Sequence, residues 1–203
     1  MPVEIVQSLI GALAVIVVAI IGYLSKRNTE LKLANTRKEL LFQHDALSLR
    51  IEAHAWHQIN LELIALAKNT CIDRFIIFCG WNGSDEPRWT TAVYQYRHGD
   101  QSHVAYVHVE TDYDYVQRLT KAKVAGELVF RTDDIQNSLI KQIYMAEEIK
   151  SAAWFHLDSR ALSGTKSRAV RYCSFATHQN VDLDNATLMH CRRIVSMIKG
   201  AMQ

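Results

Sequence analysis

The sequence has little proline, no excess of charge of one sign and no paired-cysteine motif. Pro2 and Pro87 are its only prolines in 203 residues, which excludes a proline-rich linker. Its 23 basic and 21 acidic residues give a net charge of +2, so we expect no nucleic-acid partner, because such binding needs a concentrated basic face. No CxxC pair and no zinc-ligand spacing occur among the four cysteines, which are Cys71, Cys79, Cys173 and Cys191. We therefore predict no metal site and four reduced thiols, which suit the cytoplasm.

The sequence also lacks the common catalytic and nucleotide-binding motifs. GxGxxG, GxSxG and HExxH do not occur. The segment Gly164-Thr-Lys-Ser167 is similar to the end of a phosphate-binding loop, but Thr165 stands where that loop needs glycine. Several histidines cluster around a predicted hairpin, yet the sequence supplies no partner that would make one a catalytic base. We predict that the protein is not an enzyme and has no catalytic residue.

Charge is absent from the N-terminal segment between Ile5 and Ser25, and the stretch from Leu9 to Leu24 is almost entirely apolar. A helix rises about 1.5 Å per residue, so about 20 such residues cross the ~30 Å hydrocarbon core of a bilayer. A buried core helix would carry a polar stripe, and a cleaved signal peptide would begin with a basic region. The segment has neither feature, so we predict that residues 1–25 form an uncleaved transmembrane anchor.

The charges beside this segment predict its orientation. Glu4 precedes it, whereas the basic residues Lys26, Arg27, Arg37 and Lys38 follow it. Basic residues near a span tend to remain cytoplasmic. We expect a single-pass protein of the inner (plasma) membrane, in contact with the lipid bilayer, whose large domain lies in the cytoplasm.

Residues 26–69 contain neither proline nor glycine and are rich in good helix formers. Leucines recur at every seventh position of this segment, at Leu33, Leu40, Leu47 and Leu61, and His54 occupies the remaining position of the series. Such a repeat predicts a long amphipathic helix that packs either on a second copy of the chain or on its own domain. For the first half both alternatives stay open, and from His54 to Ala67 we expect packing on the domain. A homo-dimer through this connecting helix is the expected assembly.

Residues 70–203 predict an α+β domain. Helix N-caps are expected at Thr111 or Asp112, at Asp133 or Asp134, and at Asp182 or Asp184, and Gly126 ends the first of these helices. Alternating or continuous apolar runs predict the strands, at residues 73–80, 90–97, 103–110, 127–131, 151–157 and 168–177. The order is long helix, three strands, helix, short strand, helix, two strands and helix. It favours an antiparallel sheet flanked by helices.

This order resembles that of a GAF domain, over roughly residues 50 to 203. The segment from Met145 to Leu157 looks like the helix, turn and strand of that family, and Tyr172 to Thr177 followed by an amphipathic helix resembles its ending. Together with the predicted anchor, this gives a transmembrane helix that continues into a long helix and then a GAF-like antiparallel sheet. The resemblance implies ligand sensing, dimerisation through flanking helices or a purely structural role, so we expect a membrane-anchored sensory or protein-interaction module without its own output domain, which acts by dimerising or by recruiting a protein partner.

In GAF domains the ligand usually lies between the sheet and the shorter helices. By resemblance, a ligand pocket here would draw on Tyr106, His108, Tyr115, Arg118, Trp154 and His156. The alternative is that these aromatic residues fill a closed core. The cyclic-nucleotide motif of the family is not evident, and no cysteine is clearly placed to hold a bilin, so no cofactor is predicted.

A second interpretation is a lysis protein similar to the holin of T-even phages. Those proteins also combine one N-terminal span with a compact domain that ends in a helix, and the turn Val181-Asp-Leu-Asp184 before the last helix resembles theirs. Their domain lies outside the inner membrane, whereas the basic flank predicts the opposite here. Labelling of Cys173 or Cys191 from one side of the membrane would separate the two interpretations.

Overall fold

The computed structural model describes residues 51–83, 87–99, 106–107, 109–161 and 168–202. The predicted anchor at residues 1–25 and the first half of the connecting helix lie outside these ranges. Within them, no helix is both long enough and apolar enough to cross a membrane. The sheet belongs to a compact unit of residues 45–203, which also contains the end of the segment predicted as a connector.

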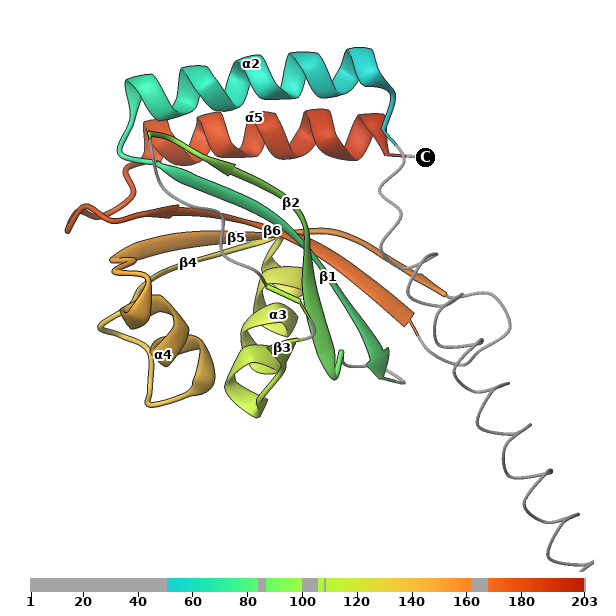
Figure 1. Cartoon of the computed structure of the whole chain (residues 1–203), viewed down its shortest axis with the longest axis vertical. Helices are drawn as coiled ribbons and strands as arrows, with labels where there is room; N and C mark the ends of the chain where they lie inside the picture. Colours follow the sequence, from blue (N-terminus) through green and yellow to red (C-terminus); the bar gives the residue numbers. More distant parts are fainter. Residues whose placement is uncertain (1–50, 84–86, 100–105, 108, 162–167, 203) are drawn as a thin grey trace, which may run out of the picture. The chain divides into compact units, whose positions relative to one another are not determined.

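The described strands form one six-stranded antiparallel sheet in the order β3-β2-β1-β6-β5-β4. This confirms the predicted α+β class and the order of its elements. The long strands β1 and β6 lie at the centre of the sheet, and most of their residues are buried because helices cover both faces (Figure 1). The strands are β1 Arg74–Gly83, β2 Trp89–Arg97, β3 Val109–Glu110, β4 Glu127–Arg131, β5 Ser151–Ala161 and β6 Arg168–Thr177.

Helices cover the two faces of the sheet in pairs. Helices α2 (Ala53–Asn69) and α5 (Asn185–Ala201) lie side by side on one face, and α3 (Tyr113–Ala125) and α4 (Leu139–Ala146) lie on the other (Figure 1). Side chains alternate between faces along a strand. On β1, Phe75 therefore joins the core under α2 and α5, and the next residue, Ile76, joins the core under α3 and α4.

Helix α2 packs on the domain through Ile59, Leu63 and Leu66, which are buried, as expected for the second half of the connecting segment. The predicted helix is not continuous through residue 52. Glu52 has an extended backbone with φ −60° and ψ 145°, while Ile51 packs against the core, so the described helix begins at Ala53.

Two predicted helix starts are confirmed. The side chain of Asp112 accepts a hydrogen bond from the backbone N–H of Tyr115 at 2.9 Å, and that of Asp184 accepts one from Thr187 at 2.7 Å. Both satisfy N–H groups that the first turn of a helix leaves without partners. Gly126 ends α3 with φ +84°, a conformation that favours glycine.

Other boundaries differ from the predictions. The N-cap of α4 is Ser138, not Asp133 or Asp134, because the segment before it turns inward to bury Ile135. Among its described residues, the segment predicted as a strand over 103–110 is a strand only at β3, although the backbone carbonyl of Tyr106 still accepts a hydrogen bond from the Ala92 N–H of β2 at 2.9 Å. Strand β5 runs past its predicted end at residue 157 to Ala161.

All four cysteines lie in the described part of the chain, and no disulfide joins them. Burial raises the pKa of the Cys79 thiol to about 12, and it raises that of Cys173 well above its usual range. These thiols therefore remain protonated near neutral pH and behave as small apolar side chains.

Candidate ligand pocket

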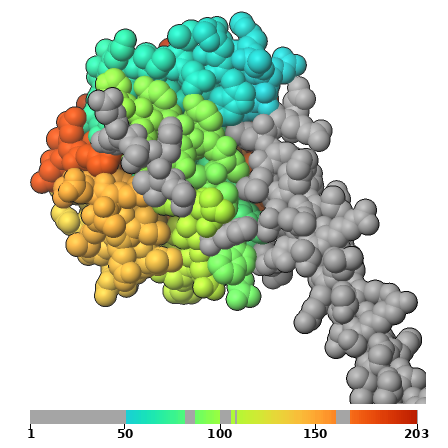
Figure 2. All heavy atoms as spheres, in the orientation of Figure 1, coloured from blue at the N-terminus to red at the C-terminus, as the bar shows by residue number. Residues whose placement is uncertain are grey.

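A small cavity lies between the sheet and the pair of helices α3 and α4. Its volume is about 20 Å³, which is room for about one water molecule. In Figure 2 the orange part of the surface, to which α4 contributes, lies directly against the green part. The wall consists of Phe78, Thr90, Tyr106, Val109, Tyr115, Ile140, Ile143, Tyr144 and Trp154.

Aromatic rings make up much of this wall and pack closely on one another. The ring centroids of Tyr115 and Trp154 are 5.2 Å apart, and those of Phe130 and Trp154 are 5.5 Å apart in an edge-to-face arrangement. Phe78, which is also part of the wall, stacks on Tyr172 with the ring centroids 5.2 Å apart. Rings at these distances stabilise each other beyond the area that they bury. The cavity wall is therefore made largely of closely packed aromatic side chains.

Hydroxyl groups of buried tyrosines supply the polar atoms of this face. The indole N–H of Trp154 donates to the Tyr144 hydroxyl at 2.8 Å, and the Tyr115 hydroxyl is hydrogen-bonded to that of Tyr172. Burial raises the pKa of Tyr115 far above its ordinary value, and it does the same for Tyr106 despite the opposing effect of Arg74. These phenols stay protonated, so they can orient a ligand by hydrogen bonds but do not serve as bases.

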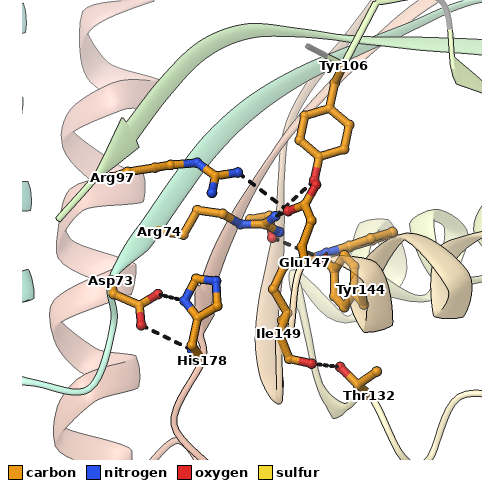
Figure 3. A network of polar contacts seen from close by, with 11 residues as sticks. Asp73, Arg74, Arg97, Tyr106, Thr132, Tyr144, Glu147, Ile149 and His178 are labelled. Atoms are coloured by element: carbon orange, nitrogen blue, oxygen red, sulfur yellow. Dashed lines mark hydrogen bonds and ion pairs between the residues drawn. The ribbon is translucent and has the colours of Figure 1, made fainter. Parts of the chain in front are cut away.

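A buried cluster of charged side chains adjoins the cavity (Figure 3). Arg74 begins β1 and Arg97 ends β2, and the two residues are paired in the antiparallel ladder. Both guanidiniums contact the Glu147 carboxylate, Arg97 through Nη2 at 3.5 Å, and Glu147 also accepts a hydrogen bond from the Tyr106 hydroxyl. The exposed fractions of the Arg74, Arg97 and Glu147 side chains are 0%, 6% and 11%. Charges removed from water to this degree require partners.

The charged cluster and the cavity share two tyrosines. Nη1 of Arg74 donates to the Tyr106 hydroxyl at 3.0 Å, and the Cζ atom of Arg74 lies 5.4 Å from the centre of the Tyr144 ring. Both tyrosines line the cavity. One end of the pocket is therefore backed by positive charge, and the rest of its wall is aromatic and apolar.

Of the six residues predicted for the pocket, three line this cavity: Tyr106, Tyr115 and Trp154. The described wall does not include Arg118, whose Nε donates to Asp114 at 2.8 Å and whose guanidinium lies over the Phe130 ring. It does not include His156 either, which stands beyond Trp154 at a bulge of β5, with a ring nitrogen 2.9 Å from the Ser159 hydroxyl. Burial lowers the pKa of His156. The sixth residue, His108, is not among the described residues.

The sequence predictions missed the charged cluster. Arg74 and Arg97 stand at strand ends, where arginines are commonly exposed, and Glu147 follows a helix. One sequence feature could have indicated the cluster: Arg74 directly precedes the apolar run of β1, where a charged side chain is drawn into the core and needs a buried partner. Within the described ranges, no group of three or more His, Cys, Asp or Glu side chains is placed to hold a metal ion.

No family model matches the sequence, and no curated protein is significantly similar to it. Solved structures are similar to it in fold. The GAF domain of a two-component sensor histidine kinase from Bacillus halodurans matches with a TM-score of 0.52 and 13% identity, over 75% of this chain and 95% of that one. A far-red cyanobacteriochrome photoreceptor matches with a TM-score of 0.52 and 11% identity, over 85% of this chain and 96% of that one. The antiparallel sheet with a helix pair on each face is thus a GAF-like fold, as the sequence resemblance implied.

Proposed function

We propose that this protein is a membrane-anchored sensory module whose GAF-like domain binds a small ligand in the cavity between its sheet and helices α3 and α4. The observation that carries the proposal is the composition of the cavity wall, where aromatic rings and protonated tyrosine hydroxyls meet a buried arginine pair. Binding sites for small molecules are commonly apolar enclosures with a few convergent polar groups. The sensor kinase and the photoreceptor that share the fold make a sensory role the natural proposal.

Signalling in this proposal passes through α2. Leu61 and Ile64 on this helix are 47% and 38% exposed, although neighbouring apolar residues of the same helix are buried. Leu61 continues the seven-residue repeat of leucines from the preceding segment. An exposed apolar seam of this kind favours pairing with the same helix of a second copy. A ligand that alters the domain would then alter how two anchored chains pack, or which protein partner they recruit.

Thermal unfolding of the full chain in detergent, with and without members of a chemically diverse ligand set, tests the pocket. Ligands of the cavity are expected to raise the melting temperature, because a compound that binds the folded state stabilises it. Ile143→Phe serves as the blocked variant, since Ile143 lines the cavity and the larger ring fills it. Compounds that stabilise both proteins equally bind elsewhere and count against the proposal, as does a set in which nothing stabilises the wild type.

Sidedness separates this function from the holin-like alternative. Cys173 and Cys191 are both fully buried, so labelling them would report unfolding and not topology. Ser196 is exposed on α5, and Ser196→Cys supplies an accessible thiol. An impermeant maleimide is expected to label it in inverted membrane vesicles and not in intact spheroplasts. Labelling in spheroplasts, together with abrupt loss of membrane integrity on induced expression, would favour the holin-like role.

A further inference from the structure

One edge of the Arg74 guanidinium has no acceptor among the described residues. Nη1 donates to Glu147 and to the Tyr106 hydroxyl, whereas Nε and Nη2 are buried without a hydrogen-bond partner. The N–H groups of Nε and Nη2 point in the same direction and form a fork that matches the two oxygens of a carboxylate. Buried donors without acceptors are rare and unfavourable, so this fork indicates a missing anionic partner.

The balance of charge points the same way. Within the described residues the cluster holds two guanidiniums and one carboxylate, and Nε of Arg97 also lacks an acceptor. The other acidic side chain in Figure 3, Asp73, is held by His178, whose Nδ1 is 2.8 Å from Asp73 Oδ1 and whose backbone N–H donates to Oδ2. One positive charge of the buried pair is therefore left over, and one further anion would neutralise it.

The Arg74 guanidinium adjoins the proposed pocket through the two tyrosines that it contacts. Arg74 contacts Tyr106 and lies over the Tyr144 ring, and both of these residues line the cavity. We infer that the ligand of this pocket is an aromatic or aliphatic carboxylate, with its carboxylate on the Nε and Nη2 edge of Arg74 and its apolar body among the tyrosines and Trp154. The inference rests on the ligand-binding function proposed above and names its chemical class.

Binding such a molecule requires the cavity wall to move, because about 20 Å³ is smaller than an aromatic ring. Glu147 caps the end of α4, and Glu148 after it has φ +58°, a left-handed conformation that L side chains rarely adopt. A ligand carboxylate competes with Glu147 for the two arginines. Binding would therefore loosen the end of α4 and move the helix that closes the cavity.

Benzoate and its uncharged isostere benzamide test the chemical class, with binding to the full chain in detergent followed by ligand-observed NMR. Benzoate is expected to bind about tenfold more tightly than benzamide, because charge-assisted bidentate contacts are roughly twice as strong as neutral ones. Ile143→Phe is expected to abolish the binding of both compounds, since it fills the cavity.

Variants of the charged cluster assign the effect to its residues. Arg74→Lys keeps the charge but removes the fork, and is expected to reduce the preference for benzoate to about threefold or less. Glu147→Gln removes the competing carboxylate and is expected to tighten benzoate binding about tenfold without changing benzamide binding. Arg192→Lys, at a surface ion pair with Glu127, is the control that leaves both affinities unchanged. Near-UV circular dichroism verifies that each variant is folded, and if Arg74→Lys unfolds, Glu147→Gln decides.

The outcomes separate this inference from the function on which it rests. Equal affinities for benzoate and benzamide, both lost in Ile143→Phe, would overturn the carboxylate class and leave the pocket standing. A folded Glu147→Gln protein that binds benzoate no better than the wild type would also overturn it. If neither compound binds the folded wild type, both the pocket and the carboxylate inference fail.

Discussion

Among the described residues, Glu147 supplies the carboxylate that neutralises part of the charge of two buried guanidiniums. Removing its charge therefore tests directly how much this buried cluster contributes to the stability of the domain. Glu147→Gln keeps the size of the side chain and one oxygen acceptor, and it removes the charge. Removing one partner of a buried ion pair typically destabilises a protein by about 3–5 kcal/mol, since the remaining charge stays buried. We take the lower end, about 3 kcal/mol, because glutamine still accepts a hydrogen bond. For a chain of this size that corresponds to a melting temperature lower by roughly 6–12 °C.

Urea unfolding of the full chain in detergent, followed by tryptophan fluorescence, measures this loss. All four tryptophans lie in the domain, and Trp81 and Trp154 are buried, so the signal reports the domain and not the anchor segment. Glu148→Gln is the matched control, because it removes the same charge from the exposed neighbouring position. We expect it to change the free energy of unfolding by no more than about 0.5 kcal/mol. If the two variants unfold at the same urea concentration, the arginine charges do not depend on Glu147 and the reasoning is refuted.

Three further predictions concern α2, the topology and α3. Leu61→Glu combined with Ile64→Glu is expected to convert the detergent-solubilised dimer into a monomer, as measured by light scattering. The control Met189→Glu, at an exposed apolar site of α5, is expected to leave the dimer intact. If the wild type and both variants are dimers, the exposed apolar residues of α2 do not form the dimer contact. Ser196→Cys is expected to react with an impermeant maleimide in inverted vesicles only, and reaction in spheroplasts would reverse the predicted orientation. Gly126→Ala is expected to cost about 1–2 kcal/mol of stability through its positive φ alone, since no atom lies within 4 Å of the added Cβ; unchanged urea unfolding would contradict this.

Local signals predicted the elements of the domain well. Asp112 and Asp184 cap helices because their short side chains reach the N–H groups of the next turn, and Gly126 ends a helix because it tolerates positive φ. Local signals failed where two starts were equally good. Asp133 and Ser138 are both capable N-caps, and the burial of Ile135 selects the second.

Some residues of the candidate site were predicted correctly from the sequence, and others were not. Tyr106, Tyr115 and Trp154 were predicted from the family resemblance, which specifies the face of the sheet on which a ligand lies. Arg118 and His156 were also placed there, yet Arg118 is held by Asp114 one helical turn away, and His156 stands beyond the cavity at a bulge. A bulge and an ion pair redirect single side chains without changing the pattern of apolar residues, so pattern reasoning does not detect them.

The amino-acid sequence by itself determined the order of strands and helices, the antiparallel α+β class and the apolar stretch at the N-terminus, because periodicity and capping act over a few neighbouring residues. Only the tertiary structure decided that Arg74, Arg97 and Glu147 meet out of reach of water. Arg74 and Arg97 are brought together by the register of one hairpin, and Glu147 lies 73 positions along the chain from Arg74. Whether such residues share a buried site depends on strand order and on how α4 packs, which no local pattern encodes.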